Sequence, residues 1–467
     1  MPALDEIRHV VVLMLENQSL DHLLGFLQLP DPAQQIQGLT GNESIPADPA
    51  APGNPVQVSR VATRDAYVTD PSPGHEFEDV NQQIFGAREP AAFPAAPPMN
   101  GFVVNYAEQL GHDGRAIGPE RGRSIMQCLD PSLVPVISTL ARNFVVCDHW
   151  HSSVPGPTWP NRFFVHAATS NGLVESPKNP DVIASQFWGS QYRMRTIYEE
   201  LMEHGYTWKI YFDDHPQSFA LRNLHPYAAD LFCRMEVLAQ DVQNATLPNY
   251  AFVEPQYFGA LGNPANDQHP PHNLLEGERL IAWVYDTLRS REDIWQHTLF
   301  VLLYDEHGGF YDHVGPRGAE IPDAASANNP QFKFDRLGVR VPALLISPWV
   351  GTGRVDHTVY DHTSLLATVK KLFNLPKFLT ARDAQAHTFE GDFLAAPRPT
   401  VDTPQNLSAL VRRMPVATTS ADDQKLSDNQ QALLALARAL QMPQSEHEAA
   451  GQIDALTRQF RREVESP

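Results

Sequence analysis

Two apolar runs of the sequence each end in oxygen-bearing side chains that could hold a metal ion. Residues 8–15 are followed by Glu16 and Asn17, and residues 298–304 by Asp305 and Glu306. Near-continuous apolar runs of this kind are typical of buried parallel strands, and open α/β sheets bind ligands at the carboxyl ends of their strands. Carboxylate and amide oxygens suit Mg²⁺, Ca²⁺ or Mn²⁺. The pattern predicts one divalent ion, with Zn²⁺ also open, although each acidic pair could equally face solvent at a strand end.

A proline-rich stretch between Ser152 and Arg162 holds a candidate nucleophile. Its three prolines and one glycine leave the loop little conformational entropy to lose. The Thr158 hydroxyl within it could attack phosphorus if a nearby cation lowered its pKa. The alternative is that Thr158 is an ordinary capping hydroxyl before a helix predicted over residues 161–169.

The sequence contains 19 histidines, and three of them lie in loops beside proline, glycine or aspartate: His75, His215 and His269. A histidine can bind a phosphoryl oxygen or protonate a leaving group. Each of the three could equally be a surface or packing residue. Four others lie inside the strongest motifs and are expected to brace functional residues rather than react: His22, His307, His313 and His362.

Strands and helices are expected to alternate along the chain. Besides the two strands above, apolar runs predict strands at 143–148, 207–212 and 341–347, and helical periodicity predicts helices at 196–204, 275–290 and 364–373. This alternation indicates an α/β fold with a central, mostly parallel sheet between helices. Two Pro-rich stretches, residues 30–60 and 86–100, are expected to be surface loops.

Composition excludes several classes of protein. The 467 residues carry a formal net charge of −20, and no Lys/Arg run is present to neutralise the phosphates of a nucleic acid. No apolar run approaches the roughly 20 residues that cross a bilayer, and no signal peptide is recognisable at the start. The sequence therefore predicts a cytoplasmic protein, with secretion by a signal-independent route left open. Its three widely spaced cysteines form neither a disulfide framework nor a zinc pattern.

The last part of the chain has a different composition. We expect a catalytic domain over residues 1–400, and a linker with a helical appendage over 401–467. A helix is predicted from Gln430 to Met442, and a further helical pattern follows at Ile453, Leu456, Phe460 and Val464.

Several motifs together resemble the phosphoesterase family, which includes bacterial phosphatidylcholine-type phospholipases C, plant non-specific phospholipases C and some bacterial acid phosphatases. The matching segments are residues 16–22, 153–162, 305–313, 338–342 and 360–364. The resemblance implies an alkaline phosphatase/sulfatase-like fold. Two positions depart from the usual pattern: Gln18 stands where arginine is common, and Leu20 where an aromatic residue is common.

The resemblance also implies roles for individual residues. Glu16, Asn17, Asp305, Glu306 and Thr158 correspond to the metal ligands. Thr158 corresponds to the nucleophile that forms a phospho-enzyme, and His269 to a phosphate-binding residue and acid; His75 and His215 are further matches for phosphate binding.

The leading hypothesis is a phospholipase C that releases diacylglycerol and a phosphorylated head group from glycerophospholipids. A phosphatase of soluble phosphomonoesters, or a non-catalytic phosphate- or lipid-binding protein on the same scaffold, remain alternatives. The expected partner is a phospholipid or small phosphate ester, with at most peripheral membrane contact and no nucleic acid. Trp159 and the Pro-rich loops are expected to form an apolar entrance.

Overall fold

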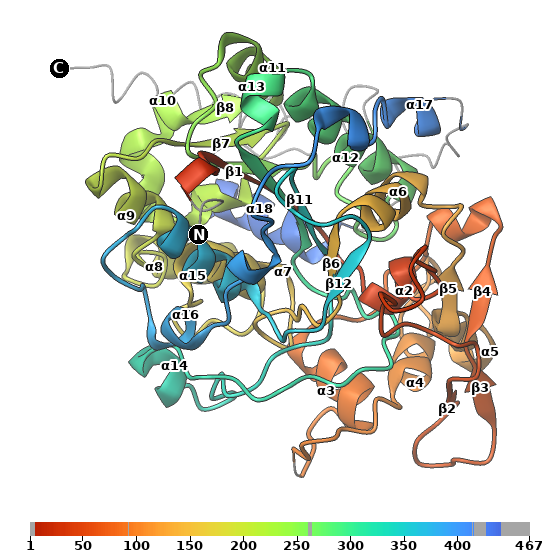
Figure 1. The fold of residues 1–467 in the computed structure, drawn as a ribbon. Coiled ribbons are helices and arrows are strands. Elements are labelled where there is room, and N and C mark those ends of the chain that lie inside the picture. The colour runs from red at the N-terminus through yellow and green to blue at the C-terminus, as the bar shows by residue number, and fades with distance from the viewer. Residues whose placement is uncertain (1–4, 92, 260–263, 413, 415–425, 440–467) are drawn as a thin grey trace.

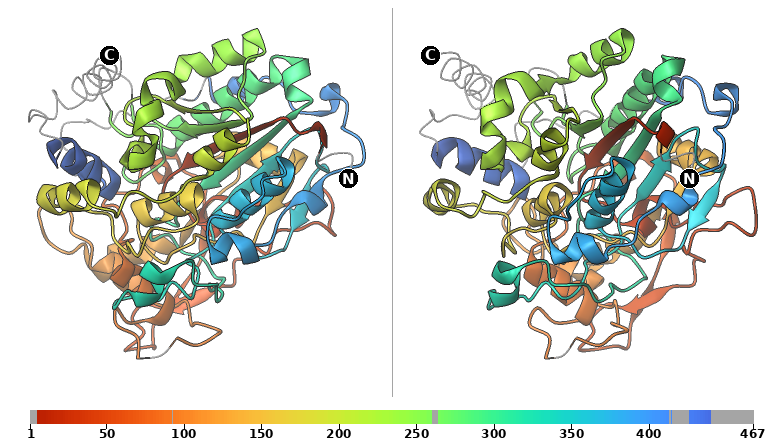
Figure 2. Two further views of the ribbon diagram at one scale, coloured as in Figure 1. Left: turned by 90° about the vertical axis from the view of Figure 1, so that its left-hand side faces the viewer. Right: turned by 60° about the vertical axis from the view of Figure 1, so that its left-hand side comes forward.

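A mixed sheet of eight strands forms the centre of the molecule (Figures 1 and 2). The computed structural model describes residues 5–91, 93–259, 264–412, 414 and 426–439. The strand order is β12-β6-β11-β10-β1-β9-β7-β8. The bounds are β1 (His9–Leu15), β6 (Val145–Cys147), β7 (Trp208–Phe212), β8 (Phe232–Arg234), β9 (Tyr250–Glu254), β10 (Thr298–Tyr304), β11 (Ala343–Ile346) and β12 (Arg354–Asp356).

The sheet is mostly parallel, as predicted. Only β11 among these eight strands runs against its neighbours, β10 and β6. The central strands β1 and β10 pair in parallel over seven positions, from His9 opposite Thr298 to Leu15 opposite Tyr304. Every residue of β10 is buried, which explains its unbroken apolar sequence.

Helices cover both faces of the sheet (Figures 1 and 2). One layer is built around α12 and consists of α6 (Pro135–Asn143), α11 (Met235–Asn244), α12 (Leu274–Arg289), α13 (Glu292–Trp295) and α17 (Ser408–Val411). The other layer contains α7 (Thr158–Ala167), α8 (Pro180–Trp188), α9 (Ile197–Glu203), α15 (His362–Leu372) and α16 (Ala381–Gln385). The predicted α/β sandwich is therefore confirmed.

A smaller apolar cluster lies beside the main core and includes Phe310 and Tyr311, which follow β10. The segments around it are α2 (Leu20–Leu24), β2 (Ser44–Pro46), β3 (Pro55–Gln57), β4 (Ser59–Val61), α3 (Phe77–Phe85), α4 (Phe102–Ala107), α5 (Gly118–Gly122) and β5 (Gln127–Leu129). The stretch 30–60, predicted as loop, thus includes two short strands and the start of a third, because alternate side chains such as Ile45 and Val56 are buried.

The remaining described helices are α10 (Ala228–Leu231), α14 (Ala324–Asn328) and α18 (Asp428–Ala439). Helix α18 overlaps the helix predicted over 430–442 and packs against α8 and α7. Its Leu433 and Leu436 are buried in the main core, which ties this helix to the body of the protein. The helical pattern at 453–464 lies outside the described residues. Within the part of the chain that the structure describes, no helix is both long and apolar enough to cross a membrane.

Candidate functional site

The ends of β1 and β10 bring the two acidic pairs together. Because Leu15 lies opposite Tyr304, the chain continues from both strands at the same edge of the sheet. The Asn17 amide donates a hydrogen bond to Oδ1 of Asp305 at 3.1 Å. The Gln18 amide donates to the carbonyl oxygen of Glu306 at 3.0 Å. Glu16, Asn17, Asp305 and Glu306 are all completely buried, so the alternative of solvent-facing carboxylates is excluded.

Several polar atoms of these residues have no partner among the described residues. They are Oε2 of Glu16, Oε1 of Glu306, and both Oδ1 and Nδ2 of Asn17. Buried acceptors are almost always satisfied by a hydrogen bond or an ion. Asn17 holds its position with φ of 57°, in the left-handed region that asparagine tolerates better than most residues. Oxygen atoms of this type fit a hard divalent cation.

The charges at the strand ends do not balance. Arg162 on α7 lies 3.3 Å from Oε1 of Glu16, and its Nε donates to Oδ2 of Asp305 at 3.2 Å. Burial raises the pKa of Glu16 and of Glu306 well above the usual range and raises the pKa of Asp305, while the Arg162 charge opposes this for Glu16 and Asp305. Arg162 also lies 4.0 Å from Oε2 of Glu254, so this one guanidinium faces three buried carboxylates, and a divalent cation would compensate the excess negative charge.

Thr158 is the first residue of α7, one helical turn before Arg162. The prediction that the helix begins at Asn161 was three residues late. Pro157 occupies the N-cap position, so the alternative of a capping hydroxyl at Thr158 is wrong. Proline is sterically suited to the positions around a helix start. The Thr158 hydroxyl instead donates to Oδ1 of Asp428, at a long 3.4 Å, and the residue is completely buried.

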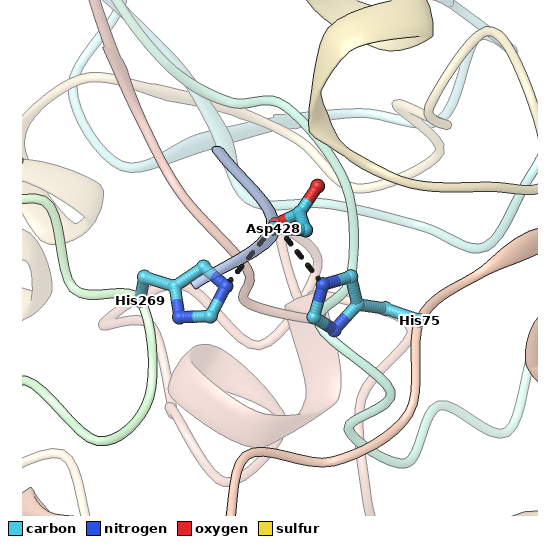
Figure 3. A group of neighbouring side chains, drawn as sticks. All are labelled: His75, His269 and Asp428. Atoms are coloured by element: carbon cyan, nitrogen blue, oxygen red, sulfur yellow. Dashed lines mark hydrogen bonds and ion pairs between the residues drawn. The ribbon is translucent and has the colours of Figure 1, made fainter. Parts of the chain in front are cut away.

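Two of the three predicted phosphate-binding histidines meet at that same carboxylate (Figure 3). Nε2 of His75 lies 3.2 Å from Oδ1 of Asp428, and Nε2 of His269 lies 3.4 Å from it. Hydrogen bonds and charge from His269 and His75 hold the pKa of Asp428 well below its usual range, although burial alone would raise it. Burial would lower the pKa of His75, but the Glu306 and Asp428 charges raise it well above the usual value.

Both histidine rings are held by backbone oxygens. Nδ1 of His75 lies 2.9 Å from the carbonyl oxygen of Pro73, and Nδ1 of His269 lies 2.5 Å from that of Pro270. A carbonyl oxygen only accepts, so Nδ1 of each ring carries a proton. Nε2 is thus the nitrogen that each ring presents to the site.

A cavity of about 300 Å³ leads to these histidines. Its lining includes His75, His269 and Asp428, together with residues such as Leu110 and Lys178. Such a cavity is at the lower end of the range for small-molecule sites. His215 is not among the described residues that line it; its ring packs edge-on against Phe258, 5.0 Å between centroids. A phosphate-binding role for His215 stays a prediction.

The four histidines expected to be braces are all buried or partly buried and hold neighbouring motifs. His362 Nε2 lies 2.7 Å from the carbonyl oxygen of Asp305, which fixes the backbone at the end of β10. His307 contacts Gln83 at 2.8 Å and His22 contacts Gln18 at 2.6 Å. His313 contacts Asp21 at 2.6 Å. None of these four lines the cavity among the described residues.

Trp159 does not form an apolar entrance. Its side chain is completely buried against Phe163 and Tyr192. Its indole Nε1 donates to Oδ1 of Asn429 at 3.0 Å. Trp159, next to Thr158 in the sequence, therefore anchors α18 rather than receiving lipid.

Three residues of the site were missed from the sequence: Arg162, Asp428 and Asn429. Nδ2 of Asn429 donates to Oε1 of Glu16 at 2.7 Å, so α18 also reaches a predicted metal ligand. Arg162 is the last residue of the motif at 153–162. The need for a positive charge beside several buried acids could have pointed to it. Asp428 and Asn429 carried no signal, since about 120 residues separate them from the last acidic pair.

Comparison with known proteins is consistent with this geometry. A family model described as the Phosphoesterase family matches residues 7–376. The chain belongs to the phosphoesterase family. The prediction of a phosphoric ester hydrolase is thereby confirmed. Helix α18 and the residues Asp428 and Asn429 lie beyond the matched segment of this phosphoesterase.

Named relatives of this phosphoesterase include two Arabidopsis thaliana proteins. The chain is 37% identical to non-specific phospholipase C3, covering 93% of this chain and 82% of that protein. It is 38% identical to non-specific phospholipase C6, covering 93% and 81%. Non-hemolytic phospholipase C of Pseudomonas aeruginosa is 26% identical, over 80% of this chain and 54% of that protein. A solved structure of an alkaline phosphatase superfamily protein from Vibrio parahaemolyticus overlaps with a TM-score of 0.33 and 13% identity, covering 68% of this chain and 82% of that one.

Proposed function

We propose that this phosphoesterase is a metal-dependent phospholipase C that transfers the head-group phosphoryl to Thr158 and then to water. The observation that carries the proposal is the position of the first turn of α7. Its Thr158 hydroxyl faces the His75–His269 pair through Asp428, while Arg162 on the same helix contacts Glu16 and Asp305. One helix start thus joins the nucleophile to the predicted metal ligands.

Glu16, Asn17, Asp305 and Glu306, together with the Thr158 oxygen, would hold one divalent ion. When bound, that ion lowers the pKa of a coordinated hydroxyl and neutralises phosphoryl charge. The unpartnered oxygens of Glu16, Asn17 and Glu306 support this ligand set. Hard oxygen donors favour Mg²⁺, Ca²⁺ or Mn²⁺ over Zn²⁺.

The chain's own residues would divide the reaction between them. Thr158 Oγ attacks phosphorus and the diacylglycerol oxygen leaves, so that the head-group phosphoryl is esterified to Thr158. His75 and His269 bind the non-bridging oxygens through Nε2, and His269 is the candidate to protonate the leaving oxygen. Water then releases the phosphorylated head group. Phosphoryl transfer of this kind depends mainly on positioning and charge neutralisation.

The relatives named as phospholipases C support a phospholipid substrate. The test compares phosphocholine release from phosphatidylcholine with hydrolysis of a soluble aryl phosphate by the metal-loaded protein. We expect faster turnover of the lipid; faster turnover of the aryl phosphate would instead indicate a phosphatase.

The nucleophile is tested separately. Acid-quenched protein should carry a phosphoryl-containing adduct on the peptide with Thr158, and Thr158→Ala should lose both the adduct and hydrolysis by about 10⁴-fold. Thr158→Ser is the matched control, since it keeps the hydroxyl and should retain measurable turnover. Hydrolysis by Thr158→Ala at the wild-type rate would contradict the assignment.

A further inference from the structure

The carboxylate of Asp428 lies where the substrate's phosphoryl group is expected. Its Oδ1 accepts the Thr158 hydroxyl at 3.4 Å and faces Nε2 of His75 at 3.2 Å and of His269 at 3.4 Å (Figure 3). These are the same three groups that the proposed function assigns to the phosphoryl group. A carboxylate and a phosphoryl oxygen compete for such donors because both are anionic acceptors.

The two histidines have no other N–H to offer. Each Nδ1 is already held by a backbone carbonyl, of Pro73 for His75 and of Pro270 for His269. Only Nε2 of each ring can therefore donate to a phosphoryl oxygen, and both Nε2 atoms face Asp428. A second anion beside the carboxylate would meet like-charge repulsion in a buried site, where charges are poorly screened.

The carboxylate of Asp428 also lines the cavity. Asp428, His75 and His269 belong to its lining, whereas Thr158 is not among the described lining residues and is completely buried. A substrate in the cavity can therefore contact Asp428, while the Thr158 hydroxyl is covered.

The residues that follow Asp428 hold the start of α18 in place. Asn429 is anchored to Glu16 and Trp159, and Gln430 donates to the carbonyl oxygen of Tyr257 at 2.6 Å. The second carboxylate oxygen of Asp428 already accepts from Ser176 Oγ at 2.6 Å. The cationic Lys178 lies in the lining of the same cavity, on the same stretch of chain as Ser176.

We propose that Asp428 is the resident anion of the phosphoryl site, and that the substrate's phosphoryl group displaces its carboxylate from Thr158, His75 and His269. This inference rests on the proposed function, because it takes those three groups as phosphoryl donors. In the resting enzyme the carboxylate keeps the donors assembled around one point. On binding, it turns towards Ser176 and Lys178 and exposes the Thr158 hydroxyl.

The test measures binding of inorganic phosphate to the metal-loaded full chain by titration calorimetry. The measurement is made at the same pH for every variant. Asp428→Asn keeps the shape of the side chain and removes its charge. We expect phosphate to bind about tenfold more tightly than to wild type.

Asp79→Asn is the matched control. Asp79 lines the same cavity but pairs with Arg88 at 2.7 Å, so removing its charge leaves the histidines and Thr158 untouched. We expect its phosphate affinity to stay within about twofold of wild type, since a partly exposed charge is largely screened. Equal tightening by both variants would show a general charge effect and overturn the proposal.

Ser176→Ala provides a second route if Asp428→Asn fails to fold. Loss of the Ser176 hydroxyl removes a group towards which the displaced carboxylate turns, and phosphate should then bind about two- to fivefold more weakly. Unchanged or weaker binding in Asp428→Asn, or unchanged or tighter binding in Ser176→Ala, contradicts the exchange. Absence of phosphate binding in wild type and Asp428→Asn alike would contradict the proposed phosphate site itself as well.

Discussion

Two buried clusters of charge, each centred on an arginine, both include an acidic residue from the segment that follows β1. In the first, Arg162 faces Glu16 and Asp305. In the second, Arg340 faces Asp21 at 3.1 Å and Asp312 at 2.9 Å. All six side chains of Arg162, Glu16, Asp305, Arg340, Asp21 and Asp312 are completely buried. Burial and composition therefore do not distinguish the two.

Hydrogen bonding does distinguish them. Arg340 uses Nη1 for the carbonyl oxygens of Gln37 and Asp148, both at 3.0 Å, and its other nitrogens for the two aspartates. The second oxygen of Asp21 accepts from His313, and that of Asp312 accepts from the Asp21 amide. The Arg162 cluster instead keeps unpartnered atoms on Glu16, on Glu306 and on Arg162 itself. A satisfied cluster holds the fold together, whereas unsatisfied buried acceptors are available for a ligand.

We call the cluster of Arg162, Glu16, Asp305 and Glu306, with its unpartnered atoms, the open cluster. The largest effect is expected on removing one charge from it. Glu306→Gln takes away an unpartnered buried carboxylate oxygen and should lower activity by about 10³-fold through loss of the metal ion. The stability of the metal-free protein should not fall, because a buried charge without its cation is itself unfavourable. Metal analysis and chemical denaturation of both proteins measure the two quantities. Full metal content in Glu306→Gln would show that this carboxylate is not a ligand.

We call the hydrogen-bonded cluster of Arg340, Asp21 and Asp312 the closed cluster. Removing one charge from it should lower stability and leave activity and metal content unchanged. Asp312→Asn breaks one of the two ion pairs of Arg340, which should lower the free energy of unfolding by about 3 kcal/mol. Turnover per folded molecule and metal content should stay at the wild-type level. Loss of metal with unchanged stability would reverse the assignment of the two clusters.

Removal of the ion should act on one cluster only. An ion present at about 100 times its dissociation constant stabilises the folded state by about 2.7 kcal/mol, so chelation should lower the melting temperature of wild type. Chelation of Asp312→Asn should lower its melting temperature by a similar amount, whereas Glu306→Gln should not respond. A chelator response in Glu306→Gln equal to that of wild type would place the ion elsewhere, for example at the group formed by Asp148, His149 and His357.

Helix α18 contacts the open cluster but not the closed one among the interactions described above, through the hydrogen bond from Asn429 to Glu16. Asn429→Ala removes the donor to Glu16 Oε1, and metal affinity should fall about tenfold, as is usual for residues that orient a ligand. Asn429→Asp, which places a like charge against Glu16, should weaken the ion more than alanine does. A calorimetric titration of metal into apo protein measures both. Wild-type affinity in both variants would remove α18 from the site.

The smallest effect concerns His313, at the edge of the closed cluster. His313→Gln weakens one contact to Asp21 and should cost about 1 kcal/mol of stability, with metal binding intact. The Asp21 charge and hydrogen bond raise the pKa of His313 above its ordinary value even though burial opposes this. Thermal denaturation near neutral pH checks the prediction. A larger loss in metal affinity than in stability would contradict it.

The two central strands of the sheet, and the edge at which the candidate site lies, could be predicted from the sequence. The strands at 9–15 and 298–304 are buried on both faces, so their apolar runs are unbroken, and the polar residues that follow mark the edge. Strand β9, at Tyr250–Glu254, was missed although it is fully buried, since a short apolar run does not by itself distinguish a strand from a buried helix segment.

The part of the site contributed by α18 could not be predicted. Asp428 and Asn429 precede an ordinary Ala/Leu-rich helix, and nothing in their spacing relates them to Glu16 or Thr158. Only the tertiary packing of α18 against α7 and α8 brings them to the strand ends. Likewise, the neighbours of His215 depend on loop geometry, which residue types alone do not encode.

The most direct test of the central claim is a crystal structure of the protein soaked with Mn²⁺, located by its anomalous scattering. The account predicts one ion within roughly 2.0–2.6 Å of oxygens from Glu16, Asn17, Asp305 and Glu306, with the Thr158 hydroxyl beside it. An ion found only at Asp148, His149 and His357, or none at the ends of β1 and β10, would contradict it.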